Sequence, residues 1–433
     1  LTICIFVIRL YSIAEVLTMI ATASRAVITG LGVISPNGKN NEEFWNSILY
    51  GKSGIKPIEN FDTSEYSTKI AGLITDFNPE DCIDKKEAKR MSRFSQFSIA
   101  AAKMAVLDSN LQISLENNQE VGVILGISVN GFEIIEKEMK VLFEKGCKFI
   151  NPFTVFGVFP NSAAGHLAIS LGIKGRSMTI STGCSSSLNA IGHAYELIKY
   201  NKLMCAVCGG AEAPITPSIM SAFCASHSLS QRNDEPEKAS RPFDKNRDGY
   251  LLSEGSAMFV MENLEHALKR NAKIYAEVIG YANTSEAYSM YKMDDTGNEA
   301  ARVIFMALQD AGINYKEVDY ISAHGSSSYV SDIRETRAIK KVMNGHSYKV
   351  NISSIKSMIG HPLGAAGGLQ TASAILAGKH GYIPPTINYE VFDPECDLNY
   401  VPNETIRKKI NVALINSFGM GGNNSSLVLR INV

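Results

Sequence analysis

Short apolar runs rich in β-branched residues alternate with longer helical patterns along most of this chain. In the first half, AVITGLGVIS, VGVILGIS and MTISTGC alternate with SQFSIAAAKMAVLDSN and SSSLNAIGHAYELIKY. The second half repeats the theme, from AKIYAEVIGYA to the final NVALINSFGMGGNNSSLVLRIN. Strands that alternate with helices in this way predict an α/β fold in which helices cover both faces of a sheet.

Length and composition limit how the chain is organised. Its 433 residues are 45% hydrophobic and 20% charged, which excludes disordered, collagenous and coiled-coil proteins. A chain of this length favours two or three core units packed into one body. Strand-turn-helix segments with a polar or reactive residue at the turn occur in both halves, in ISTGCSSSLNAIG and in ISSIKSMIGHPLGAAGG. These two segments suggest a duplicated unit.

Charge and hydropathy argue against two kinds of partner. The chain has 42 Lys and Arg against 43 Asp and Glu, and its net charge of -1 provides no field for nucleic acid. Residues 1–24 are apolar, but Arg9 and Glu15 leave no uncharged stretch of the ~20 residues that a membrane span needs, and a signal peptide fits poorly. Met19 precedes the first clear strand, so we interpret residues 1–24 as an N-terminal extension from a misassigned start. We expect no nucleic-acid partner and no membrane partner.

The eight cysteines are scattered without the spacing of a disulfide framework. This scatter indicates a reducing compartment, and we expect a cytoplasmic protein. Cys205 and Cys208 lie in an apolar run that predicts a buried strand, where residues three apart face opposite sides of the sheet. No second pair of ligands follows them, so no metal site is predicted.

Three reactive residues follow predicted strands. Cys184 opens a helix, where free backbone N–H groups and the helix dipole stabilise a thiolate. His324, in ISAHGSSS, and His361, in SIKSMIGHPLGAAGG, each end a strand, and Lys356 lies five residues before His361. Any one of them alone is more often a structural residue. Because α/β sheets bind ligands at the carboxyl ends of their strands, the three together predict an active site.

Two further motifs indicate structure rather than a cofactor. The glycine-rich NSFGMGGNN lacks the Lys-Ser/Thr of a P-loop and the GxGxxG order of a dinucleotide turn, so no nucleotide is expected. Its backbone N–H groups suit an oxyanion hole or a loop that moves. In the acidic tract Arg241–Ala267, Lys245 and Arg247 interleave the acids, and no twelfth-position Glu completes a calcium loop. We interpret this tract as a salt-bridged turn before a strand.

Eight segments, in order and over roughly residues 25–433, resemble the β-ketoacyl-acyl-carrier-protein synthases, which are condensing enzymes of the thiolase fold. They are TISTGCSSSLNAIGHA, GGAEAPITPS, QRNDEPEKASRPFDKNRDGYLLSEG, AKIYAEVIGYANTSEAY, ISAHGSSS, SSIKSMIGHPLGAAGG, DPECDLNYVPN and NSFGMGGNNSSLVL. The resemblance implies two thiolase-type halves stacked as a five-layered αβαβα body. The N-terminal half, residues 25–265, carries the nucleophile, and the C-terminal half, residues 266–433, carries the two histidines. The resemblance also implies an obligate dimer.

The resemblance assigns roles to the reactive residues. Cys184 matches the nucleophile that accepts an acyl chain from the phosphopantetheine arm of acyl carrier protein. His324 and His361 match two histidines whose Nε2 atoms stabilise the enolate formed when malonyl on the carrier protein loses carbon dioxide. The enolate then attacks the acyl group on Cys184, whose oxyanion lies between the backbone N–H groups of Cys184 and Phe418. Both substrates arrive on the carrier protein, so the resemblance implies no permanently bound cofactor.

Supporting residues also match the family pattern. Lys356 matches a lysine that supports one histidine, and Glu335 matches the acid that accompanies it. Ser326 and Ser328 replace two threonines that hydrogen-bond the pantetheine arm. Phe418 matches the gating aromatic residue of the SFG turn.

Two subfamilies fit these motifs. Elongating 3-oxoacyl-acyl-carrier-protein synthases II of fatty-acid synthesis form homodimers, whereas ketosynthase alpha subunits of type II polyketide synthases pair with a cysteine-less chain-length factor. The segments STGCSSSLNA, APITP, SAMFVMEN and SSIKSM are closer to the polyketide alpha subunits, and we favour that interpretation. A non-catalytic scaffold that binds carrier protein is a further alternative, which the intact Cys184 opposes. The starter unit and the product length stay open.

A basic run is the candidate for carrier-protein docking. Carrier proteins are acidic, so their docking is expected on basic surface near the tunnel mouth. Lys85, Lys86, Lys89, Arg90 and Arg93 form such a run on one predicted helix. The alternative is an ordinary solvated helix face.

Overall fold

Ten strands form one hydrogen-bonded sheet in the computed structural model, which describes residues 23–431. Most of the expected N-terminal extension, residues 1–24, therefore lies outside the described residues. The strands are β1 (Ala26–Ile34), β4 (Val121–Gly126), β5 (Ser177–Ile180), β6 (Cys205–Glu212), β7 (Gly255–Asn263), β8 (Ala276–Ser285), β9 (Tyr320–Ser322), β10 (Asn351–Ser353), β13 (Val412–Gly419) and β14 (Asn423–Ile431).

The sheet divides into two halves with the same topology. The spatial order is β5-β4-β6-β7-β1 in the N-terminal half and β10-β9-β13-β14-β8 in the C-terminal half. In each half the first three strands are parallel, and the fourth and fifth are each antiparallel to the strand before them. The halves join where β1 pairs with β8, over only three residue pairs. The duplication predicted from the two strand-turn-helix segments is confirmed.

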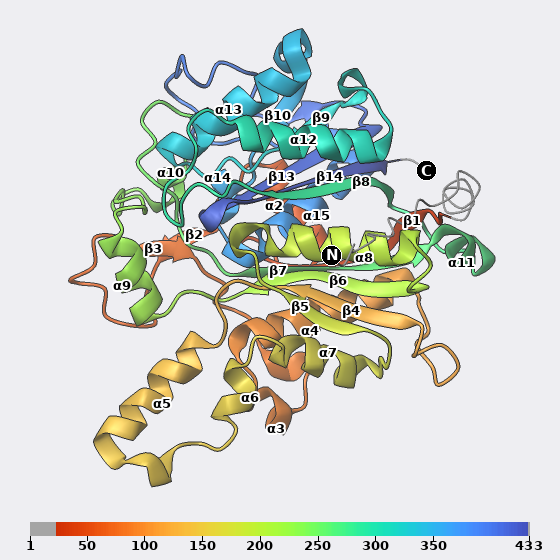
Figure 1. The fold of residues 1–433 in the computed structure, drawn as a ribbon. Coiled ribbons are helices and arrows are strands. Elements are labelled where there is room, and N and C mark those ends of the chain that lie inside the picture. Colours follow the sequence, from red (N-terminus) through yellow and green to blue (C-terminus); the bar gives the residue numbers. More distant parts are fainter. Residues whose placement is uncertain (1–22, 432–433) are drawn as a thin grey trace, which may run out of the picture.

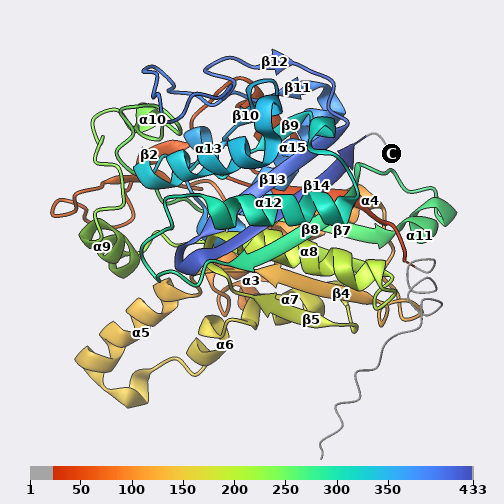
Figure 2. The ribbon, with the colours of Figure 1, turned by 45° about the horizontal axis from the view of Figure 1, so that its top comes forward.

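Helices complete a five-layered αβαβα body (Figures 1 and 2). One outer layer, α4 (Arg93–Ser109) and α7 (Ser162–Leu171), covers the N-terminal half, and the other, α12 (Asn298–Ala311) and α13 (Tyr329–Met343), covers the C-terminal half. The central layer is α8 (Ser186–Lys199) and α15 (Ala366–His380), which pack on each other between the two halves of the sheet. The predicted thiolase-like α/β architecture is confirmed.

Residue size explains how closely these layers pack. A Cβ added to Gly30 or Gly32 of β1 would lie 2.1 or 2.0 Å from a carbonyl oxygen of α4, so only glycine lets this helix approach the strand. The central helix α15 is built mainly from small residues, and Ala366–Gly378 are all buried. A helix that is buried around its whole circumference belongs to a core, and α15 accordingly has no polar face.

The remaining helices and strands surround this body. They are α2 (Asn41–Leu49), β2 (Ile55–Pro57), β3 (Ile70–Gly72), α3 (Lys85–Ala88), α5 (Phe132–Lys145), α6 (Thr154–Val158), α9 (Pro217–Ala225), α10 (Pro236–Ala239), α11 (Leu264–Lys269), α14 (Lys356–Ile359), β11 (Tyr382–Ile383) and β12 (Ile406–Arg407). Across residues 23–431, no helix is long and apolar enough to cross a membrane.

The basic run does not form one helix, so that prediction is wrong. The helix α3 is a single turn, and Arg93 instead begins α4. Arg93 is also not part of an exposed basic face, because its guanidinium forms two hydrogen bonds to Glu254, at 2.6 and 3.0 Å. Cys205 and Cys208 belong to two different core clusters on opposite faces of β6, as expected for a buried strand.

Candidate active site

Cys184 lies at the junction of β5 and α8. It occupies a 3₁₀ turn, η3 (Gly183–Ser185), and α8 begins at Ser186. Ser186 fixes this turn, because its hydroxyl accepts from the Thr182 N–H at 2.8 Å and donates to the Gly183 carbonyl oxygen at 2.6 Å. The Cys184 residue is 6% exposed.

The two histidines meet at one cavity with Cys184. His324 follows β9, as predicted. His361 instead follows α14, so the prediction that it ends a strand is wrong. Their ring centroids lie 5.3 Å apart with the ring planes at 82°. The cavity has a volume of about 490 Å³, and Phe418, Ser326 and Ser328 also line it. The fold therefore brings together reactive residues from both halves of the chain.

Both histidines are neutral at neutral pH. Burial, reinforced by the charge of Lys356, lowers the pKa of His324 and of His361 well below its usual value. The Phe418 N–H donates to Nδ1 of His324 at 3.3 Å, so the proton of this neutral ring resides on Nε2. Nδ1 of His361 is buried without a partner in the described part of the chain. A neutral imidazole with a protonated Nε2 can donate to a ligand oxygen.

Phe418 lies next to His324 in this structure. It is fully buried near the end of β13, and its ring centroid lies 5.7 Å from that of His324. The expected oxyanion hole needs its N–H, but here that N–H is engaged by His324. The turn that follows, η7 (Met420–Gly422), places Gly421 and Gly422 at φ of 78° and 77°, which glycine adopts without strain.

Lys356 and Glu335 hold the segment that carries His324. Nζ of Lys356 donates to the His324 carbonyl oxygen at 2.6 Å and to Oε1 of Gln370 at 2.9 Å. The Glu335 carboxylate accepts from the N–H groups of His324 and Gly325, at 2.9 and 2.8 Å. Burial lowers the pKa of Lys356 and raises that of Glu335. The pair holds the His324 backbone at its carbonyl oxygen, through Lys356, and at its N–H group, through Glu335.

The Cys184 thiol is protonated at neutral pH. Burial raises its pKa to about 11, although the Met420 N–H and the charge of Lys356 both lower it. The sequence predicted a stabilised thiolate at a helix N-terminus, and this prediction is wrong because burial outweighs those contributions. The thiol must therefore lose its proton as it reacts.

An apolar cluster extends from the thiol. Cys184 packs with buried or partly buried residues that come from distant parts of the chain, among them Ile215, Met220, Phe223 and Leu229. Sequence reasoning missed this cluster, because its members share no motif or spacing. It suits the hydrocarbon part of an acyl chain.

Glu212 is a second residue that sequence reasoning missed. Its buried carboxylate, at the end of β6, accepts from the N–H groups of Ser128, Val129 and Gly364, each at 2.9 Å. Burial raises its pKa to about 8. Gly364 belongs to the turn between His361 and α15, so Glu212 ties the two halves together at the site. The acidic end of the otherwise apolar run CAVCGGAE was the available signal.

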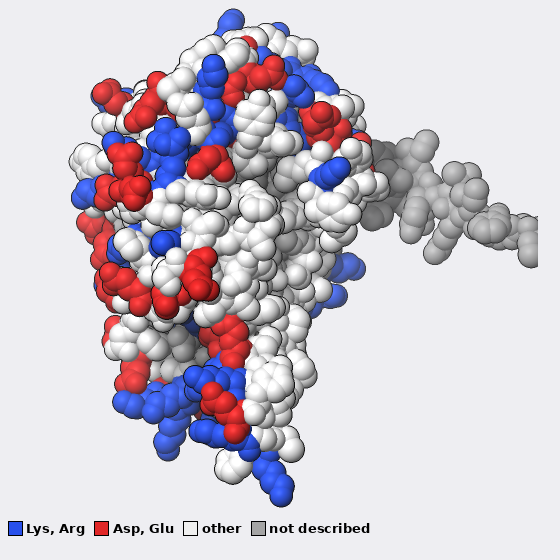
Figure 3. Space-filling view, turned by 90° about the vertical axis from the view of Figure 1, so that its left-hand side faces the viewer, with Lys and Arg blue, Asp and Glu red and all other residues white. Residues whose placement is uncertain are grey.

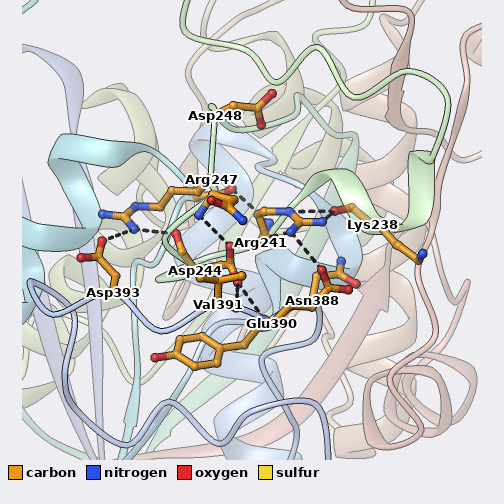
Figure 4. Close-up of polar contacts among 12 residues, drawn as sticks. Lys238, Arg241, Asp244, Arg247, Asp248, Asn388, Glu390, Val391 and Asp393 are labelled. Carbon is orange, nitrogen blue, oxygen red and sulfur yellow. Dashed lines mark hydrogen bonds and ion pairs between the residues drawn. The ribbon is translucent and has the colours of Figure 1, made fainter.

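The acidic tract is confirmed as a salt-bridged turn (Figure 4). Arg247 binds Asp393 at 2.7 Å, and Arg241 lies 3.7 Å from Asp244. Asp244 also accepts the N–H groups of Glu390 and Val391, at 2.7 and 2.6 Å. These contacts join the tract before β7 to the segment after α15. Within residues 23–431, no group of three His, Cys, Asp or Glu side chains is arranged to hold a metal ion.

Comparisons with known proteins identify the family. Residues 23–267 match the N-terminal domain model of β-ketoacyl synthases, and residues 275–390 match the C-terminal domain model. The chain is 46% identical over 405 residues to 3-oxoacyl-acyl-carrier-protein synthase 2 of Coxiella burnetii, and 42% identical over 406 residues to that of Synechocystis. Each alignment covers 94% of this chain and 98% of the relative.

A solved structure shows the same architecture. A type II polyketide ketosynthase, in complex with its acyl-carrier protein and bound to the hexaketide, superposes with a TM-score of 0.87 at 35% identity, covering 95% of this chain and 100% of that chain. The family models, the relatives and the shared fold agree with one another. The chain belongs to the β-ketoacyl synthase family and is a condensing enzyme of the acyltransferase type.

Proposed function

We propose that this chain elongates acyl chains in fatty-acid synthesis as a 3-oxoacyl-acyl-carrier-protein synthase of type 2. The observation that carries the proposal is the meeting of Cys184 with neutral His324 and His361 in one cavity, next to an apolar cluster. The curated relatives at 42% and 46% identity bear this name. They favour fatty-acid synthesis over the polyketide role that the sequence motifs alone favoured.

The first step transfers an acyl chain to the enzyme. Sγ of Cys184 attacks the thioester carbonyl of an acyl carrier protein, the Cys184 proton passes to the departing pantetheine sulfur, and a new thioester forms on Cys184. Because the thiol pKa is about 11, proton loss accompanies the attack. The apolar cluster takes the hydrocarbon chain. Ser326 and Ser328, which line the cavity, contact the pantetheine arm.

The second step forms the carbon–carbon bond. Malonyl carrier protein loses carbon dioxide, and the electron pair of the broken bond becomes an enolate. The neutral imidazoles of His324 and His361 donate hydrogen bonds to its thioester oxygen. The enolate carbon attacks the acyl carbonyl on Cys184, and the thiolate leaves and regains a proton. Two neutral donors suit an enolate, because they stabilise its charge without first protonating the carbon.

The polyketide ketosynthase alpha subunit remains the second candidate. The solved polyketide ketosynthase at 35% identity favours it. The two candidates differ in their partner, because the alpha subunit needs a chain-length factor and the type 2 synthase acts as a homodimer.

The edge of the N-terminal half supports a homodimer. Within the described residues, β5 is the last strand on its side of the sheet, which leaves its outer edge open. Met178 of β5, Ile169 of α7, Phe156 of α6 and Phe159, which follows α6, are exposed apolar side chains. Such an edge and patch suit a second copy of this chain.

Carrier protein docks on basic surface in this proposal. Lys85, Lys86, Lys89 and Arg90 are exposed. Figure 3 shows Lys and Arg side chains gathered at the lower end of the molecule, where α3 and α5 lie in Figure 1. An acidic carrier protein would be drawn there, and the association rate should fall as salt rises.

Reconstitution of the purified chain tests the proposal. Native mass spectrometry should show a homodimer that converts acyl and malonyl carrier protein to 3-oxoacyl carrier protein without another chain. Activity that appears only in a one-to-one complex with a cysteine-less partner would instead support the polyketide role. Cys184→Ala should abolish acyl-enzyme formation, and Cys184→Gln should leave a decarboxylase that cannot condense. Acyl labelling retained in Cys184→Ala would refute the assignment of the nucleophile.

A further inference from the structure

Arg334 is a buried cation beside the catalytic turn. It lies in α13, ten residues after the catalytic His324, and is 1% exposed. Its Nη2 pairs with the Glu286 carboxylate and donates to Oδ1 of Asn424 at 3.1 Å. Nε and Nη1 have no partner in the described part of the chain. A buried guanidinium with two unsatisfied nitrogens is costly, and so its position calls for a role beyond packing.

The guanidinium lies where two cavity-lining segments meet. Its central carbon lies 5.2 Å from the centroid of the Phe418 ring. Glu286 begins a segment, residues 286–295, from which Tyr288, Met290 and Tyr291 line the cavity. The Glu286 N–H donates to the Gly422 carbonyl oxygen at 3.0 Å, which joins this segment to the turn after Phe418.

Asn424 and the Glu286 carboxylate close the cluster. The Asn424 side chain donates to Oε1 of Glu286 at 3.1 Å, and the Asp294 N–H donates to Oε2 of Glu286 at 3.4 Å. Arg334, Glu286 and Asn424 thus connect three elements: α13, the segment after β8, and the first residues of β14. We call these three residues the Arg334 cluster.

We propose that Arg334 is a positioning residue that holds the Phe418–Gly422 turn and the 286–295 segment together as one unit over Cys184. The ring of Phe418 contacts both the Arg334 guanidinium and the His324 ring. The 286–295 segment is held through Glu286. The two segments therefore move together when a substrate enters the cavity. That this substrate carries an acyl group rests on the proposed function.

Access to the Cys184 thiol tests this proposal without relying on turnover. Arg334→Met alone leaves the Glu286 charge buried without a partner, so the informative variant is Arg334→Met combined with Glu286→Gln. In that double variant Cys184 should react with iodoacetamide about ten-fold faster, as measured by peptide mass mapping. A factor of this order is expected when a desolvated cation–π contact is lost. Exposed Cys147 is the internal reference. Lys340→Met is the matched control, because Lys340 lies on the same helix as Arg334 and the substitution removes its ion pair with Asp397.

The condensation rate moves in the opposite direction. Release of the Phe418 turn should lower kcat about ten-fold in the double variant, because the positioned cation–π contact is lost, while thiol access rises. Arg334→Lys, which keeps the charge, should retain part of the condensation rate and part of the protection of the Cys184 thiol. Cys184 alkylation within two-fold of the Lys340→Met control would overturn the proposal. A merely structural role would instead lower kcat without raising the alkylation rate, and that result would also overturn it.

Hydrogen exchange of the unmodified protein gives a second test that needs no variant. Peptides covering residues 286–295 and 418–422 should exchange with the same opening rate, and different rates would overturn the proposal. If the unmodified protein shows no condensation, the proposed function fails, whereas the alkylation and exchange results still decide the role of Arg334.

Discussion

The reaction of Cys184 with iodoacetamide should rise ten-fold with each pH unit from pH 7 to pH 9.5. The thiolate is the reacting form, and burial places the thiol pKa at about 11. About one thiol in 10,000 is then ionised at pH 7, compared with about one in 100 for a thiol at the ordinary value of 9.0. The difference of two pKa units corresponds to about 2.7 kcal/mol against the thiolate.

The assay follows Cys184 by peptide mass mapping at a series of pH values, with Cys147 on the protein surface measured in the same sample. A Lys356→Met variant extends the test. The Lys356 charge lowers the Cys184 pKa, so its removal should slow the reaction at every pH while the slope stays at one decade per unit. A rate that levels off below pH 9 in the unmodified protein would refute the reasoning, because it would show that the helix N-terminus outweighs burial.

Three further predictions concern other parts of the molecule. Lys356→Met should lower the condensation rate about a hundred-fold or more, because the buried His324 carbonyl oxygen loses a charged donor; a rate within three-fold of the unmodified enzyme, with the fold intact by circular dichroism, would contradict this. Tyr250 packs edge-on against His361 at 5.5 Å, so Tyr250→Ala should lower malonyl decarboxylation about ten-fold through lost packing, whereas Tyr250→Phe should stay within about two-fold. Equal losses would assign the effect to the hydroxyl. Phe97→Ala in α4 should lower the free energy of unfolding by ~3–5 kcal/mol through the cavity it leaves, and urea denaturation giving under 1 kcal/mol would contradict this.

The sequence was sufficient to predict the order of the elements and the place of the reactive residues. Apolar runs with β-branched residues located β1, β4 and β8, and the turns after strands located Cys184 and His324, whereas His361 comes after the short helix α14. These signals are local, and each depends only on residues that are neighbours in the chain. The site follows because strand ends on one side of a sheet meet there.

Properties that depend on burial could not be predicted in the same way. The helix start at Cys184 suggested a stabilised thiolate, but desolvation by distant side chains raises its pKa instead. Glu212 and Arg334 act through partners more than 40 residues away in sequence, and no motif marks those pairings. The hydrogen bond of the Phe418 N–H likewise depends on the orientation of the His324 side chain, which is 94 residues away in the sequence.

The central layer has a consequence for synthesis on the ribosome. The inner face of α8 is buried against α15, and α15 is released from the ribosome only after residue 380 has been made. Until then the N-terminal half exposes an apolar helix face to solvent or to chaperones. Translation rate over the second half of the chain, and holding of the nascent chain during that interval, should therefore affect the yield of folded protein more than any change at the active site.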